Sequence, residues 1–143
     1  MSLGPDLTGR TFPPTAPFEV THDHVAAFAR SFGASYDGGP APVTYPIVVA
    51  FAAMRGLMDD PEVGISLQHV VHGEQRFTYS RPVVPGDRLT AELTVTSVRS
   101  LGAADIIGTR SEIADAEGRP VCTAYATLVH RAPSTEGATD ADR

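Results

Sequence analysis

The densest group of residues able to do chemistry is His72-Gly73-Glu74-Gln75. In an extended strand alternate side chains share one face, so His72 and Glu74 are expected together on one face. A histidine beside a carboxylate at this spacing could be oriented for acid–base work. The alternative is a structural histidine held near a subunit interface. Gly73 indicates either close approach of a helix or ligand, or a β-bulge.

Two further residues could carry chemistry. Asp37 is a second candidate acid–base carboxylate, in a stretch of turn-forming residues. Cys122 is the single cysteine, so no intrachain disulfide can form. It lies in an apolar run typical of a strand, which favours a small buried side chain over a reactive thiol.

No metal or cofactor site is expected. The histidine pairs His22/His24 and His69/His72 have spacings that make the side chains diverge on a helix and on a strand respectively. The chain has no P-loop, no dinucleotide-binding glycine motif and no serine-hydrolase elbow. These absences give no support to nucleotide, nicotinamide or serine-hydrolase chemistry.

Two helices are predicted to position these residues. Thr21 is a plausible N-cap for a first helix with apolar residues at helical spacing, ending at Gly33. A second helix is expected to be capped by Thr44 or Tyr45, with Pro46 in its first turn, and to run to about Met58. Because this second helix is apolar almost all round, we expect it to be buried on several sides.

The remainder of the chain predicts long strands separated by turns. Alternating apolar and polar residues indicate strands over 70–83, 88–100, 106–114 and 121–130. One buried helix followed by such a meander predicts an α+β hot-dog fold, in which a long, twisted antiparallel sheet wraps around a central apolar helix. We expect a single domain over residues 1–131 and a disordered C-terminal tail over 132–143.

Charge and hydropathy limit the classes of partner. The formal net charge is -6 and all eleven basic residues are scattered arginines, which argues against nucleic-acid binding. The sequence has no apolar run near the ~20 residues that a membrane helix needs, and no signal peptide. We therefore expect a cytoplasmic protein without a membrane partner.

The His72–Gln75 run, followed by Arg81-Pro82 and Gly86-Asp87-Arg88-Leu89, resembles MaoC-like, fatty-acid-synthase-like (R)-3-hydroxyacyl dehydratases of the mycobacterial HadA and HadC type. The resemblance covers about Thr8 to Arg131. It implies a subunit that binds the acyl part of a 3-hydroxyacyl thioester, carried by coenzyme A or by acyl carrier protein. The implied activity class is a hydro-lyase.

Members of that family move protons with an aspartate and, five residues later, a histidine, in a Gly-Asp-x-Asn-Pro-x-His motif. Phe28 to Gly33 matches the run into this motif, so Ala34 stands at the aspartate position and Gly39 at the histidine position. Neither residue can move a proton. The resemblance implies a homodimer, or a heterodimer in which a catalytic dehydratase subunit supplies the missing pair.

The resemblance also implies a binding site. Backbone donors near Thr44, Tyr45 and Ile47 could hold the thioester oxygen at the start of the second helix. The residues His72, Gly73, Glu74 and Gln75 would line an apolar tunnel for the acyl chain. Two alternatives keep the fold: a thioesterase in which Asp37 or Glu74 activates water, and a non-enzymatic acyl-binding module.

Overall fold

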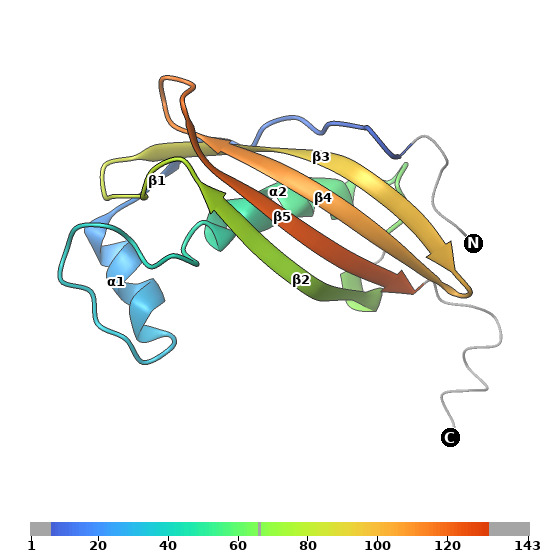
Figure 1. The fold of residues 1–143 in the computed structure, drawn as a ribbon, viewed down its shortest axis with the longest axis horizontal. Coiled ribbons are helices and arrows are strands. Elements are labelled where there is room, and N and C mark those ends of the chain that lie inside the picture. Colours follow the sequence, from blue (N-terminus) through green and yellow to red (C-terminus); the bar gives the residue numbers. More distant parts are fainter. Residues whose placement is uncertain (1–6, 66, 132–143) are drawn as a thin grey trace.

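The computed structural model describes residues 7–65 and 67–131; the predicted tail over 132–143 lies outside them. The described residues form one curled, five-stranded antiparallel sheet in the order β1-β3-β4-β5-β2, with α2 lying across one face (Figure 1). The elements are β1 (Phe18–Glu19), α1 (His22–Arg30), α2 (Ile47–Asp59), a 3-10 turn η1 (Leu67–His69), β2 (Val70–Tyr79), β3 (Arg88–Leu101), β4 (Ala104–Ala114) and β5 (Pro120–Arg131).

The strands form where apolar and polar residues alternate. In β5, Ala124, Ala126 and Leu128 are buried and their neighbours are less buried. Leu128 pairs with the buried Ile107 of β4, so the inner faces of the two strands coincide. The predicted antiparallel sheet is confirmed.

The first helix is capped as predicted. Thr21 accepts a hydrogen bond from the backbone N–H of His24 at 3.1 Å, and Val25 and Ala29 are buried. The helix ends at Arg30, and Gly33 follows with a φ of 83°, a conformation that favours glycine.

The second helix begins later than predicted. Its first residue is Ile47 and its N-cap is Pro46, with no side-chain capping hydrogen bond. Thr44 and Tyr45 lie in a preceding turn, in which the N–H of Ile47 donates to the carbonyl of Thr44 at 3.0 Å. The prediction that Thr44 or Tyr45 caps the helix is therefore wrong, because this turn already satisfies the donor that a cap would satisfy.

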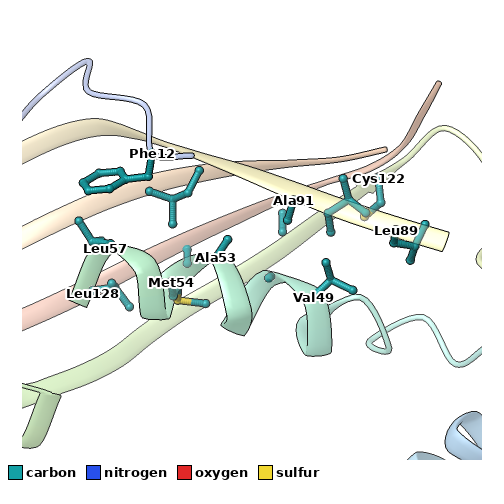
Figure 2. Packing of buried hydrophobic residues seen from close by; sticks show 14 of the residues in the cluster. Phe12, Val49, Ala53, Met54, Leu57, Leu89, Ala91, Cys122 and Leu128 are labelled. Carbon is teal, nitrogen blue, oxygen red and sulfur yellow. The ribbon is translucent and has the colours of Figure 1, made fainter. Parts of the chain in front are cut away.

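One face of the helix α2 packs against the sheet. Figure 2 shows Val49, Ala53 and Leu57 on the side of α2 that faces β3, and Ala91 of β3 and Leu128 of β5 belong to the same buried cluster. The opposite face of α2 is exposed, including 48% of Phe51. Burial of this helix on several sides is not confirmed. Among the residues described, no helix is both long and apolar enough to cross a membrane.

Arg81 has a structural role, in hydrogen bonds to two aspartates. The Arg81 guanidinium donates two hydrogen bonds to Asp87, at 3.0 and 3.1 Å, and one to Asp115 at 3.2 Å. Asp87 lies in the turn before β3, and Asp115 lies in the β4–β5 turn. The guanidinium therefore joins the connection between β2 and β3 to the β4–β5 turn, whose Asp115 lies 34 positions further along the chain.

Candidate functional site: a groove between the second helix and an edge strand

A β-bulge at Gly73 determines which face of β2 each side chain occupies. His72 pairs with Leu128 and Glu74 pairs with Thr127, so Gly73 has no partner in the ladder. Directly paired residues share a face, which places His72 on the inner face with Leu128 and Glu74 on the outer face with Thr127. The predicted pairing of His72 with Glu74 is wrong, because one extra residue reverses the alternation.

The bulge instead places Gln75 on the inner face beside His72. Gln75 pairs with the buried Ala126. The Nε2 atom of His72 lies 2.9 Å from Oε1 of Gln75, within hydrogen-bonding distance. The His72 ring also meets the Phe51 ring of α2 edge-on, with 5.7 Å between the centroids. His72 is thus oriented by an amide and an aromatic ring.

The outer-face residues of β2 have separate partners. The Glu74 carboxylate accepts a hydrogen bond from Oγ1 of Thr127 at 3.2 Å. The Arg76 guanidinium lies over the ring of Tyr125, 4.0 Å from its centroid, as a cation–π contact. Neither contact involves His72.

An open groove runs between the start of α2 and β2, and we call it the α2–β2 groove. Its volume is about 480 Å³. Its lining residues come from α1, the turn before α2, α2 itself and β2: Phe28, Thr44, Ile47, His72, Gly73, Glu74, Gln75 and Phe77. The structure therefore brings Thr44 together with the whole His72–Gln75 run. In this single chain the cavity is an open groove rather than a closed tunnel.

Only one of the predicted thioester donors remains unused. The N–H of Tyr45 donates to the carbonyl of Pro42 at 2.9 Å, and that of Ile47 donates to Thr44. Within the part of the chain that the structure describes, the N–H and hydroxyl of Thr44 make no hydrogen bond. Thr44 is exposed in the groove and can offer both donors to a ligand oxygen.

Tyr45 does not line the groove. It is fully buried, and its hydroxyl lies 2.7 Å from Nδ1 of His24 in α1. Burial raises the pKa of Tyr45 to about 12, so the hydroxyl stays protonated at neutral pH. The pair holds α1 against the start of α2. Sequence reasoning missed it, since no local pattern links residues 21 positions apart.

The structure places Asp37 outside the groove lining. Asp37 is exposed in the loop between the two helices, as are Ala34 and Gly39. Gly39 has a φ of 80°, and its carbonyl accepts a hydrogen bond from the hydroxyl of Tyr36 at 2.5 Å. A turn therefore occupies this part of the loop.

The remaining candidate groups are inert in the structure. Cys122 is 2% exposed, as predicted for a packing residue, and burial raises the pKa of its thiol to about 11. The thiol is therefore neutral at physiological pH and a poor nucleophile. Across residues 7–65 and 67–131, no cluster of three or more His, Cys, Asp or Glu side chains could hold a metal ion.

Comparisons with known proteins identify relatives that match most of the chain. A family model described as "FAS1-like, dehydratase domain region" matches residues 6–124. A UPF0336 protein of Leifsonia xyli subsp. xyli is 46% identical over 143 residues, covering 90% of this chain and 96% of that protein. The similarity therefore extends well beyond the groove.

The chain is also similar to proteins of known structure. One chain of the truncated HadBC (3R-hydroxyacyl-ACP dehydratase) complex from Mycobacterium tuberculosis is 28% identical, with a TM-score of 0.73 over 87% of this chain and 97% of that chain. A MaoC-like dehydratase from Rhodospirillum rubrum shares the fold at 21% identity, with a TM-score of 0.65 over 89% of this chain and 94% of that one. The predicted hot-dog fold is thus shared with dehydratases.

Proposed function

Because the chain belongs to the FAS1-like dehydratase family, whose structural relatives are MaoC-like dehydratases, we propose that it is the acyl-holding subunit of an (R)-3-hydroxyacyl dehydratase. In this role it binds an acyl thioester of coenzyme A or acyl carrier protein, and a catalytic partner subunit supplies the acid–base groups. The α2–β2 groove is the binding site.

The main support for this proposal is the composition of the α2–β2 groove. Phe28, Ile47 and Phe77 provide apolar walls, and Thr44 provides two unused donors in the same groove. An acyl thioester has the complementary parts, a hydrocarbon chain and a carbonyl oxygen. Each methylene buried against the apolar walls contributes about 0.8 kcal/mol, so the chain supplies affinity and Thr44 orients the thioester.

The contacts of the candidate acid–base residues favour a role in binding the acyl thioester over a role in proton transfer. Reversible hydration needs one group to move a proton at the α-carbon and another to handle the water. His72 bonds to an amide, Glu74 bonds to Thr127 on the other face, and Asp37 lies outside the groove lining. Asp37 is thus not placed to activate water in the groove, and Glu74, which does line the groove, is engaged by the Thr127 hydroxyl.

The position of the groove supports a role for a partner subunit. Among the residues that the structure describes, β2 pairs only with β5 and so forms an edge of the sheet. Another chain seated beside this edge would lie next to the groove and could close it. The structural relative HadBC is itself described as a complex.

Binding of acyl-CoAs of increasing length tests the proposal. Affinity should rise steadily from butyryl-CoA to dodecanoyl-CoA in titration calorimetry, because each methylene buries more apolar surface. Ile47→Trp should weaken binding of the longer chains, because Ile47 lines the groove and the larger side chain would occupy part of it. Gly73→Ala is the control, since its added Cβ lies toward Thr127 O and Val129 Cγ2 on the outer face, at ordinary contact distances of 3.6 and 3.9 Å. Flat affinity across the series would contradict an acyl-holding role.

A further inference from the structure

We propose that a polar hollow on the outer face of the sheet, opposite α2, binds a small uncharged sugar or polyol through its adjacent hydroxyl groups. The volume of this outer-face hollow is about 230 Å³. Its lining residues come from β2, β3, β4 and β5: Glu74, Arg76, Thr96, Ser97, Gly108, Thr109, Tyr125, Ala126 and Thr127. Glu74 of the edge strand borders both the hollow and the α2–β2 groove, and the other residues belong to the hollow alone.

A β-bulge and a glycine create the outer-face hollow. Val95 pairs with Thr109 and Ser97 pairs with Gly108, so Thr96 is the extra residue of β3. A Cβ at Gly108 would lie 2.6 Å from Oγ of Ser97 and 2.9 Å from Oγ1 of Thr96. The two hydroxyls therefore converge above the bare backbone of Gly108. Bulges are frequent beside functional sites, because they change the direction in which a side chain points.

The strand pairing places further polar groups around this glycine. Gly108 pairs with Thr127 of β5, and Thr127 pairs with Glu74 of β2. One level along the strands, Tyr125 pairs with Arg76. Because directly paired residues share a face, side chains from β2 and β5 border the hollow on the side away from β3.

Three hydroxyls in the hollow keep their full hydrogen-bonding capacity. Within the described residues, the side chains of Thr96, Ser97 and Tyr125 make no hydrogen bond. Each hydroxyl can donate one hydrogen bond and accept others. The hollow therefore offers donors and acceptors together, rather than donors alone as an anion site would.

The charges around the hollow cancel. Glu74 and Arg76 lie two residues apart on the outer face of β2, and the neighbouring Arg110 is paired with Glu112 at 3.2 Å. Glu74 accepts a hydrogen bond from Thr127 through Oε1, which leaves its other oxygen as an acceptor. Glu74 repels an anion and Arg76 repels a cation, so the hollow favours a ligand without net charge.

The adjacent hydroxyls of a sugar or polyol match this set of groups. Each ligand hydroxyl both donates and accepts, as the hydroxyls of Thr96 and Ser97 require. A carboxylate and a guanidinium each present two polar atoms in one plane, to which two neighbouring ligand hydroxyls can bind. A free amino acid would engage the two charged groups and leave the hydroxyls of β3 without a partner. The hollow is smaller than the roughly 300–1,000 Å³ of sites for drug-sized ligands, which favours a monosaccharide or smaller.

NMR titration of the isotope-labelled full chain tests the site, with glucose, mannose, ribose and glycerol as probes. At least one probe should cause saturable shifts of the Gly108 and Thr127 amide signals, with a dissociation constant in the millimolar range. Ser97→Ala and Tyr125→Phe should each weaken that binding about fivefold, because each removes one hydrogen bond. Tyr125→Phe retains the ring that Arg76 contacts.

Thr123→Val is the matched control, because Thr123 lies on the same strand and face as Tyr125 but outside the lining of the hollow. It should keep the wild-type affinity. The same spectra show whether each variant is folded. Absence of saturable shifts with all four probes, or unchanged affinity in the folded Ser97 and Tyr125 variants, would overturn the site. Tighter binding of glycine or inorganic phosphate than of every sugar and polyol would overturn the proposed ligand class.

Discussion

The hydrogen bond between His72 and Gln75 defines the chemistry available in the groove. A carboxylate partner would orient an imidazole and stabilise its protonated form, as general acid–base catalysis requires. An amide oxygen orients the ring without supplying a compensating negative charge. In the proposed role, His72 therefore recognises a ligand, and proton transfer belongs to the partner.

A second histidine, His130, makes stability depend on pH. It is 2% exposed and pairs with Asp105 across the β4–β5 ladder. Burial lowers the pKa of His130, and His69 lowers it further, while the carboxylate of Asp105 opposes them. The folded state therefore favours neutral His130. This contribution to stability is fully present above the unfolded pKa of about 6.5 and is lost as the pH falls below it.

Urea unfolding at pH 8 and pH 5 measures this effect. We expect the wild-type free energy of unfolding to fall on acidification, by at most about 1.4 kcal/mol per pH unit from this one group. His130→Gln should reduce the pH dependence, whereas His22→Gln, at an exposed site, should not. An unchanged pH dependence in His130→Gln would show that another group is responsible.

Among the elements, β3 carries a second bulge, between Val95 and Ser97. Gly108 of β4 lies opposite it. A Cβ at Gly108 would lie 2.6 Å from Oγ of Ser97 and 2.9 Å from Oγ1 of Thr96, so the two hydroxyls would have to move. The bulge therefore depends on a glycine in the neighbouring strand.

Thermal and urea denaturation should show different effects on stability for alanine substitutions at the two strand glycines, Gly108 and Gly73. We expect Gly108→Ala to destabilise the fold by about 1 kcal/mol or more, because overpacking displaces its neighbours. Gly73→Ala should change stability by no more than about 0.5 kcal/mol, since its Cβ meets only ordinary contacts. Equal effects of the two substitutions would contradict this assignment of close packing to Gly108.

The elements could be predicted from the sequence to a greater extent than the site. Alternation in β3, β4 and β5 and the Thr21 cap depend on local patterns, and the structure confirms both. The Gly73 bulge could not be distinguished from a close approach, because both favour glycine in a strand. Without the bulge, regular alternation predicts Glu74 on the same face as His72. The pairing of β2 with β5 shows that Gln75 occupies that face instead. The contact between His24 and Tyr45 is likewise tertiary.

Over residues 7–65 and 67–131, β2 leaves one edge of the sheet unpaired, and exposed apolar side chains border that edge. Val71 of this strand is 64% exposed. Phe51 of α2 is 48% exposed, and its ring contacts His72 of β2. A ten-residue edge strand with apolar neighbours favours pairing with another chain. We therefore expect assembly through β2.

Sedimentation velocity at micromolar concentration tests this expectation. The purified chain should be at least dimeric, or should become so on mixing with its catalytic partner. Val71→Lys and Phe51→Glu should each shift the distribution toward monomer, because charge at the edge opposes strand pairing. Leu101→Lys, 56% exposed at the end of β3 and separated from β2 by β4 and β5, should have no such effect. A wild-type chain that stays monomeric in both conditions would rule out this mode of assembly.

In the proposed assembly, this chain holds the acyl thioester while a partner subunit performs the chemistry. The most direct test of this division of roles is hydration of crotonyl-CoA by the purified chain alone, by a MaoC-like subunit of the same genome that carries the Gly-Asp-x-Asn-Pro-x-His motif, and by the two co-expressed. We predict that the chain alone is slower than the co-expressed pair by about 10⁴-fold or more, since two proton-transfer groups each contribute about 10²- to 10⁴-fold. Rapid hydration by the chain alone, abolished by Asp37→Ala, would show that this chain is itself the catalytic subunit.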